Sequence, residues 1–160
     1  MIEVKVDAVL FNNSANAPVM LLREVGGKRV LPVSIGIAEA STISYALQGV
    51  QYVRPLTVDL MRNIIHGLNG SLSRVIITKL EDNTFYAELI IETREGILAL
   101  DARPSDSVGL ALRMGAPIFV EDDVMDNAGQ WLSDEDEVHL EELRTKLRHI
   151  NPEDFGSSQV

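Results

Sequence analysis

The sequence has no cysteine, no long apolar run and few basic residues, and each shortage excludes a class of protein. Without cysteine the chain can form neither disulfide bonds nor thiolate metal sites. It contains no run of about 18 apolar residues, so no membrane span or membrane partner is expected. Residues 1–7 alternate between apolar and polar side chains and lack the apolar core of a signal peptide. We therefore expect a cytoplasmic protein.

The shortage of basic residues limits how the chain can contact nucleic acid. Only 14 lysines and arginines stand against 24 aspartates and glutamates, which gives a formal net charge of −10. Proteins that hold RNA or DNA through broad phosphate contact usually have a basic face. Any such contact is therefore expected to be weak and local, made by a few arginines in a cleft. Much of the acidic excess lies between Glu121 and Glu142.

Several common signatures of catalysis are also missing. The chain has no serine nucleophile elbow, no phosphate-binding glycine loop and no dinucleotide fingerprint. Its three histidines, His66, His139 and His149, do not cluster in the manner of a metal site. Any chemistry must therefore come from carboxylates and arginines.

The hydrophobic pattern predicts one α+β domain. A length of 160 residues is typical of a single domain, and a hydrophobic content of 46% is enough for a core. Alternating or continuous apolar runs predict strands over 2–10, 19–24, 28–33, 74–80, 85–91, 97–100 and 118–120, of which 97–100 is expected to be buried. Helices are predicted over 37–47, from an N-cap at Thr57 to about Leu68, and from Pro104 to just before Gly115.

The order strand–strand–strand–helix occurs twice in this pattern. We therefore predict a mixed or antiparallel sheet with two β-β-β-α-like halves and helices packed on it, plus an acidic C-terminal helix. The chain is expected to divide into a body, residues 1–130, and an acidic tail, residues 131–160. Trp131, at the junction, is expected to pack against the body.

The tail is predicted to form a helix that Ser133 caps. Its apolar residues repeat at three- and four-residue steps and form a narrow seam for docking on the body or on another subunit: Leu140, Leu143, Leu147 and Ile150. A small sheet can also leave an edge strand that needs cover. Both features predict a homo-oligomer, most simply a dimer.

Candidate site residues gather around two Arg-Pro pairs, Arg54-Pro55 and Arg103-Pro104. Asp101 ends the strand before the second pair, and three predicted helices carry a carboxylate in the first turn: Glu39, Asp59 and Asp106. Helix capping alone could explain such carboxylates, because an acid there stabilises a helix by roughly 0.3–1 kcal/mol. Buried pairing of each arginine with a neighbouring carboxylate would explain the same residues without a ligand.

The alternative is a site that binds and cleaves a phosphodiester. The fork of donors on arginine suits phosphate, and helix N-termini are anion sites. If the two corners meet, four residues would bind the substrate: Arg54, Arg103, Thr57 and Ser105. The catalytic carboxylates would be Glu39, Asp59, Asp101 and Asp106, of which the three aspartates would hold a divalent metal such as Mg²⁺ or Mn²⁺. Asp101, at the end of a strand, is a better metal ligand than Asp106, because the positive end of a helix repels a cation.

Four motifs, in order, resemble the bifunctional nuclease family over roughly residues 1–128. They are Leu31-Pro32-Val33-Ser34-Ile35-Gly36 with Glu39-Ala40, then Arg54-Pro55-x-Thr57-x-Asp59-Leu60, then Thr84-Phe85-Tyr86-Ala87, and Asp101-Ala102-Arg103-Pro104-Ser105-Asp106. The resemblance implies a bifunctional-nuclease-like domain over 1–130 that degrades RNA and DNA. The second motif of the family has a histidine before the aspartate, where this chain has Val58. Some plant members also carry a C-terminal module for protein interaction, where this chain has its acidic helix.

Two functional hypotheses follow. The first is a metal-dependent nuclease that hydrolyses phosphodiester bonds of RNA and DNA. The second is a non-catalytic binding or assembly module, in which the Arg-Pro and Asp corners are structural and the acidic helix recruits a partner. The net charge and Val58 favour the second, and the family resemblance favours the first. We take the nuclease as the working hypothesis.

Overall fold

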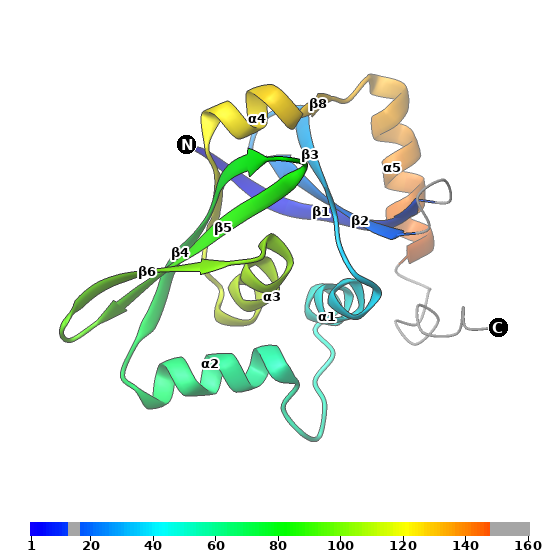
Figure 1. Cartoon of the computed structure of the whole chain (residues 1–160). Coiled ribbons are helices and arrows are strands. Elements are labelled where there is room, and N and C mark those ends of the chain that lie inside the picture. Colours follow the sequence, from blue (N-terminus) through cyan, green and yellow to red (C-terminus); the bar gives the residue numbers. More distant parts are fainter. Residues whose placement is uncertain (13–16, 148–160) are drawn as a thin grey trace.

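The computed structural model describes residues 1–12 and 17–147, and it forms one open sheet with helices (Figure 1). The eight strands are β1 (Ile2–Asn12), β2 (Ala17–Glu24), β3 (Arg29–Ser34), β4 (Ser71–Glu81), β5 (Thr84–Thr93), β6 (Gly96–Ala102), β7 (Ile118–Val120) and β8 (Gln130–Trp131). The five helices are α1 (Ile37–Leu47), α2 (Thr57–Gly67), α3 (Pro104–Met114), α4 (Asp122–Ala128) and α5 (Asp134–Leu147). No helix in this part of the chain is long and apolar enough to cross a bilayer.

Two similar halves build the sheet. In each half three consecutive strands pair antiparallel and lead into a helix, as β1-β2-β3-α1 and as β4-β5-β6-α3. The short strand β7 joins the halves, because it pairs antiparallel with β1 and parallel with β4. The strand order is β6-β5-β4-β7-β1-β2-β3-β8. The predicted α+β class with a mixed sheet and two β-β-β-α halves is therefore confirmed.

The main core lies between one face of the sheet and the helices α1 and α3. Alternation along the strands sends every second side chain to this face, so Val75 and Ile77 of β4 meet Val108 and Leu110 of α3, all completely buried. Helix α2 packs on α3 and forms the outer margin of the helical layer (Figure 1). The helical layer therefore holds the first turns of α1, α2 and α3 in fixed positions.

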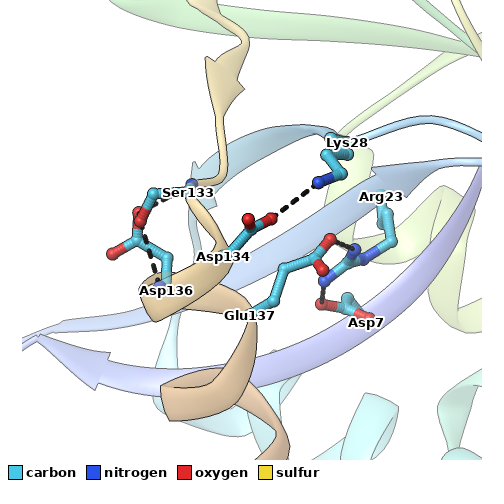
Figure 2. A network of polar contacts seen from close by, with 7 residues as sticks. All are labelled: Asp7, Arg23, Lys28, Ser133, Asp134, Asp136 and Glu137. Carbon is cyan, nitrogen blue, oxygen red and sulfur yellow. Dashed lines mark hydrogen bonds and ion pairs between the residues drawn. The ribbon is translucent and has the colours of Figure 1, made fainter.

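Helix α5 covers part of the opposite face, where Leu140 packs with Ala8 and Leu21 in a second, smaller cluster. Figure 2 shows the polar contacts that hold the start of the helix. Arg23 lies between Asp7 and Glu137, at 3.3 and 3.1 Å, and Lys28 Nζ lies 2.8 Å from Asp134 Oδ1.

The first turn of α5 also confirms the predicted cap. Ser133 Oγ accepts a hydrogen bond from the Asp136 N–H at 3.1 Å, while the Ser133 N–H and hydroxyl donate to Asp136 Oδ2. This reciprocal arrangement satisfies donors at the helix start. Of the expected apolar seam, Leu140 is buried; the side chains of Leu143 and Leu147, and the whole of Ile150, lie outside the described residues.

Two local expectations are corrected, and one connection contains elements that the sequence did not predict. The connection after β7 contains α4 and β8, and β8 pairs with β3 through Arg29 and Val30. Trp131 is 74% exposed instead of packed on the body, with the Arg29 guanidinium 5.7 Å from its ring centroid. Thr57 is the first helical residue of α2, because Leu56 has the extended backbone of the N-cap.

Candidate active site

Arg103 is the centre of a group of opposite charges in the helical layer. It is the N-cap of α3, directly after β6 and before Pro104. Its Nε and Nη2 donate to the two carboxylate oxygens of Asp106 at 2.7 and 3.0 Å, a bidentate pair. The same Nη2 lies 3.0 Å from Glu39 Oε1 of α1. One arginine therefore links the first turns of two helices.

The two carboxylates occupy equivalent places in the two halves. Glu39 is the third residue of α1 and Asp106 is the third residue of α3. Gly36, the N-cap of α1, makes room for Glu39, because a Cβ at that position would lie 2.1 Å from Glu39 Oε2. The repeat of the β-β-β-α unit therefore brings both first-turn carboxylates to one guanidinium.

The Arg103 guanidinium is accessible to a ligand. Its side chain is 65% exposed, whereas Glu39 and Asp106 are 22% and 36% exposed. The hydrogen bond and charge of Asp106, and then the charge of Glu39, raise the pKa of Arg103 further, so the group stays cationic. Two carboxylates surround one guanidinium, so the cluster carries a net charge of about −1. The same two carboxylates hold the guanidinium in a fixed position, where its donors can bind a planar anion.

Asp59 forms a separate, buried pair with Arg113, a residue that the sequence analysis did not select. Arg113 lies in the last turn of α3, with Nε 3.4 Å from Asp59 Oδ1 and Nη1 donating to the Val50 carbonyl at 3.3 Å. Asp59 Oδ2 accepts a hydrogen bond from the Leu56 N–H at 3.0 Å. The two side chains are only 13% and 10% exposed. The capping interpretation therefore applies to Asp59.

Asp101 lies on the other face of the sheet from this group. Leu100 and Ala102 pair with Leu89 and Ala87 of β5, which belong to the main core, so Asp101 must point the opposite way. It is exposed there beside Lys79 of β4, whose pKa is raised chiefly by Glu81 and slightly by Asp101. The sheet therefore separates Asp101 from Glu39 and Asp106.

The other expected substrate-binding residues are dispersed. Arg54 is exposed in the loop between α1 and α2, and Thr57 is exposed at the start of α2. Ser105 is 8% exposed at the second position of α3, next to Arg103. Asp59 contacts the last turn of α3 and Asp106 lies in its first turn, along a helix about 16 Å long. The carboxylates of the two Arg-Pro corners therefore lie at different ends of α3.

Val58 lies at the place where the three helices of the layer meet. It is 6% exposed, and a Cβ added at Gly109 of α3 would lie 3.4 Å from Val58 Cγ1 and 3.7 Å from Thr42 Cγ2 of α1. Valine fills this contact with apolar surface. The side chain at this position faces the packing between helices and not the Arg103 cluster.

The carboxylates do not form a ready metal site. Within residues 1–12 and 17–147, no group of three or more His, Asp or Glu side chains is arranged to hold a metal ion. Glu39 and Asp106 are the closest to such a group, and Arg103 already pairs with both. The expected cluster of three aspartates is therefore not assembled in this structure.

The chain matches the model of one protein family and is similar in sequence to several known proteins. The family model for the bifunctional nuclease domain matches residues 20–133. An uncharacterized protein of Mycobacterium tuberculosis is 42% identical over 98% of this chain and 99% of its own length. Bifunctional nuclease 1 of Oryza sativa subsp. japonica is 24% identical over 75% of this chain, and bifunctional nuclease 2 of the same plant is 29% identical over 67%. These matches span only 37% and 34% of the plant proteins.

Proposed function

This chain belongs to the bifunctional nuclease domain family, and from that premise we propose that it is a nuclease whose catalytic centre is Arg103 with Glu39 and Asp106. The single observation that carries the proposal is the exposed guanidinium of Arg103, held by carboxylates from two helices. The substrate would be a nucleic acid, RNA or DNA, and the plant relatives are named as bifunctional nucleases.

Arg103 would bind the phosphodiester. A phosphate oxygen pair has the same planar, bidentate geometry that Asp106 offers now, so phosphate can replace a carboxylate on the guanidinium. The N-terminus of α3 adds a favourable dipole for an anion at this position. Ser105, the second residue of α3, is the nearest hydroxyl of the set expected from the sequence.

Glu39 and Asp106 would act on water. The incoming phosphate would release a carboxylate from Arg103, and this carboxylate can accept a proton from a water molecule. The oxygen of that water molecule attacks phosphorus at the same time. The bond from phosphorus to the leaving oxygen then breaks, and that oxygen takes a proton from solvent. Neither role requires Asp59 or Asp101, since the first is engaged with Arg113 and the second lies across the sheet.

The proposal includes a divalent cation that enters with the nucleic acid. Because Arg103 occupies both carboxylates, the described residues do not fit a preformed cation site. Mg²⁺ commonly binds through one or two carboxylates together with substrate phosphates. We therefore expect Mg²⁺ or Mn²⁺ to be required for turnover without binding tightly to the protein alone.

The second candidate function is a non-catalytic assembly module, and the buried Asp59–Arg113 pair favours it. That pair fixes α2 against α3 and explains one of the two Arg-Pro motifs by structure alone. If Arg103, Glu39 and Asp106 have the same purpose, their removal will alter stability and there will be no cleavage to lose.

Cleavage of end-labelled RNA and DNA by the purified chain distinguishes the two functions. We expect cleavage with Mg²⁺ or Mn²⁺, no cleavage after chelation, and a loss of at least about 30-fold in kcat/KM for Asp106→Asn. Asp123→Asn is the matched control, because Asp123 is an exposed first-turn carboxylate of α4 remote from Arg103 in sequence. Activity that survives both chelation and Asp106→Asn would refute the proposed centre.

A further inference from the structure

The two outer edges of the sheet, at β3 and at β6, differ in whether another strand covers them. Strand β3 ends the first half, and its outer edge pairs with β8. Strand β6 ends the second half, and among the described residues no strand pairs with its outer edge. A seven-residue strand with one unpaired row of backbone donors and acceptors is a template for another strand.

The surface beside β6 is unusually apolar. On the helical side of the strand, Leu98 and Leu100 are 49% and 43% exposed. The adjoining helix α2 adds three more exposed apolar residues: Leu60, Ile64 and Leu68. Leu68 and Leu98 line the same hollow, which lies between the end of α2 and the β5–β6 hairpin. We call these five residues, together with the β6 edge, the β6 surface.

The structure points to a second copy of this chain as the occupant: we propose that two copies pair antiparallel through their β6 edges about a two-fold axis. Each chain carries a net charge of −10, so two copies repel unless they meet on weakly charged surface. Strand β6 has a single charged residue, Asp101, among its seven. A two-fold contact also brings each β6 surface against an identical apolar strip.

The register of the pairing follows from the strand itself. Residues directly opposite each other must face the same side of the sheet. The two-fold axis must therefore pass beside a residue of β6 and not between two consecutive residues. Centring it on Ala99 pairs all seven residues, from Gly96 opposite Ala102 to Leu98 opposite Leu100 of the second copy. The four leucines of the two strands then form one apolar patch on the helical side.

Charge favours the same register. With the axis at Ala99, the one charged residue of each strand, Asp101, lies opposite Ile97 of the second copy. Moving the axis to Leu98 sets Glu95 opposite Asp101, a like-charge pair. Moving it to Leu100 leaves Ile97 opposite Arg103 and shortens the ladder.

The dimer sets the Arg103 clusters beside the interface, because β6 leads directly into Arg103. Six apolar side chains of each copy are exposed here, three of β6 and three of α2, with Ile97 at 70% exposure. A stable interface buries about 800 Å² per partner, and these side chains contribute to it together with the backbone ladder of β6. The inference concerns assembly and stands whether or not the Arg103 cluster cleaves nucleic acid.

The first test is the mass of the full chain by sedimentation equilibrium at micromolar concentration. We expect a particle of twice 17.6 kDa. Leu98→Glu should raise the dimer Kd at least about 100-fold, because it sets unpaired carboxylates on the apolar patch. Val138→Glu, on an exposed apolar residue of α5, is the matched control and should leave the dimer intact. A monomeric wild type, or a dimer weakened only by Val138→Glu, would overturn the proposal.

The second test reads the register by cross-linking, which the absence of cysteine makes clean. Directly opposite residues in an antiparallel pair have Cα atoms about 4.5–5.5 Å apart, which is within disulfide range. Ala99→Cys, which faces itself across the axis, should therefore form a covalent dimer under mild oxidation. Asp101→Cys lies two residues off the axis and should cross-link at least about 10-fold more slowly. Equal rates for the two variants, with native far-UV dichroism, would refute pairing centred on Ala99.

Discussion

Arginine–carboxylate pairs have two different roles in this molecule, and burial separates them. The Arg113 and Asp59 side chains are 10% and 13% exposed and join α3 to α2. The Arg103 side chain is 65% exposed and joins α3 to α1. A buried pair contributes chiefly by avoiding an unpaired charge, whereas an exposed pair contributes little to stability and remains accessible to a ligand. The same chemistry therefore supports the fold at Arg113 and the proposed site at Arg103.

Asp59→Asn should destabilise the protein by about 3 kcal/mol, because it leaves the buried Arg113 guanidinium without its counter-charge. Chemical denaturation measures this loss, and Asp123→Asn should stay within about 0.5 kcal/mol of the wild type. Specific activity, corrected for the folded fraction, should be nearly unchanged in Asp59→Asn. A fully stable but inactive Asp59→Asn would show instead that Asp59 belongs to the catalytic group.

Part of the candidate site could be predicted from the residues. Glu39 and Asp106 were selected as first-turn carboxylates, and Arg103 as an anion-binding residue; the structure brings these three together. Alternation along β6 could also have shown that Asp101 faces away from Leu100 and the core. Arg113 offered only a weak signal, a basic residue in the last turn of a helix. Its partner Asp59 depends on how α2 packs, which no local pattern reveals.

In the part of α5 whose side chains are described, charges and the buried Leu140 attach the helix to the sheet. Lys28 holds the pKa of Asp134 below its ordinary value of 3.8, and the hydrogen bonds from Ser133 lower the pKa of Asp136 in the same way. A carboxylate with a lowered pKa stabilises the folded state above its ordinary pKa, and this stabilisation is lost as pH falls through the lowered value. The pKa of Lys28 is raised, so its contribution disappears only above about pH 10.5.

We therefore expect α5 to fray and detach below about pH 4, while its protection is constant from pH 5 to 9. Hydrogen exchange of the α5 amides measures this, with the amides of β4 in the main core as the internal reference. Ser133→Ala should weaken the first turn and raise the pH at which protection is lost. Protection of α5 that is unchanged down to pH 2.5 would contradict a charge-based attachment.

Removal of residues 133–160 should leave a folded body. Among the side chains that the structure describes, none of α5 belongs to the main core, and Leu140 joins the smaller cluster with Ala8 and Leu21. Removing α5 exposes that cluster and the Arg23–Asp7 pair, which lowers the stability of the body. We therefore expect a lower Tm, with a single cooperative transition. Differential scanning calorimetry of chain 1–132, which keeps β8, gives the answer. A broad, non-cooperative transition would mean that α5 is part of the folding unit.

The strands and the three helices of the helical layer were predictable because their apolar periods are strong. The Ser133 cap and the duplicated order are both found as the sequence indicates. Helix α4 has only two buried residues, Val124 and Met125, and β8 has two residues in all, so neither has a period to detect. The pairing of β8 with β3 is set by the tertiary fold and could not be inferred locally.

The whole molecule is acidic, and this limits how it can hold nucleic acid. With a net charge of −10 and one exposed arginine at the proposed centre, few phosphates can be neutralised. The slope of log K against log salt counts those phosphates, so a value no steeper than about −2 is expected. Fluorescence anisotropy with labelled single-stranded DNA at 50–300 mM salt, under chelation to prevent cleavage, measures it. A slope near −6 would require a basic surface that the sequence does not provide.

The proposed dimer edge and the proposed catalytic centre are adjacent, because β6 forms the edge and leads directly into Arg103. Cleavage and dimerisation therefore have to be measured in parallel for each variant. Sedimentation of every site variant shows whether a change in cleavage follows from the loss of Arg103 or from the loss of the dimer.

Arg103→Lys tests the central claim most directly, because it keeps the charge and removes only the bidentate fork. We predict that kcat/KM for cleavage of labelled RNA and DNA falls at least about 30-fold, while Tm stays within a few degrees because the pair is exposed. Wild-type activity in Arg103→Lys, or a loss that merely tracks a lowered Tm, would contradict a phosphate-binding arginine at the N-terminus of α3.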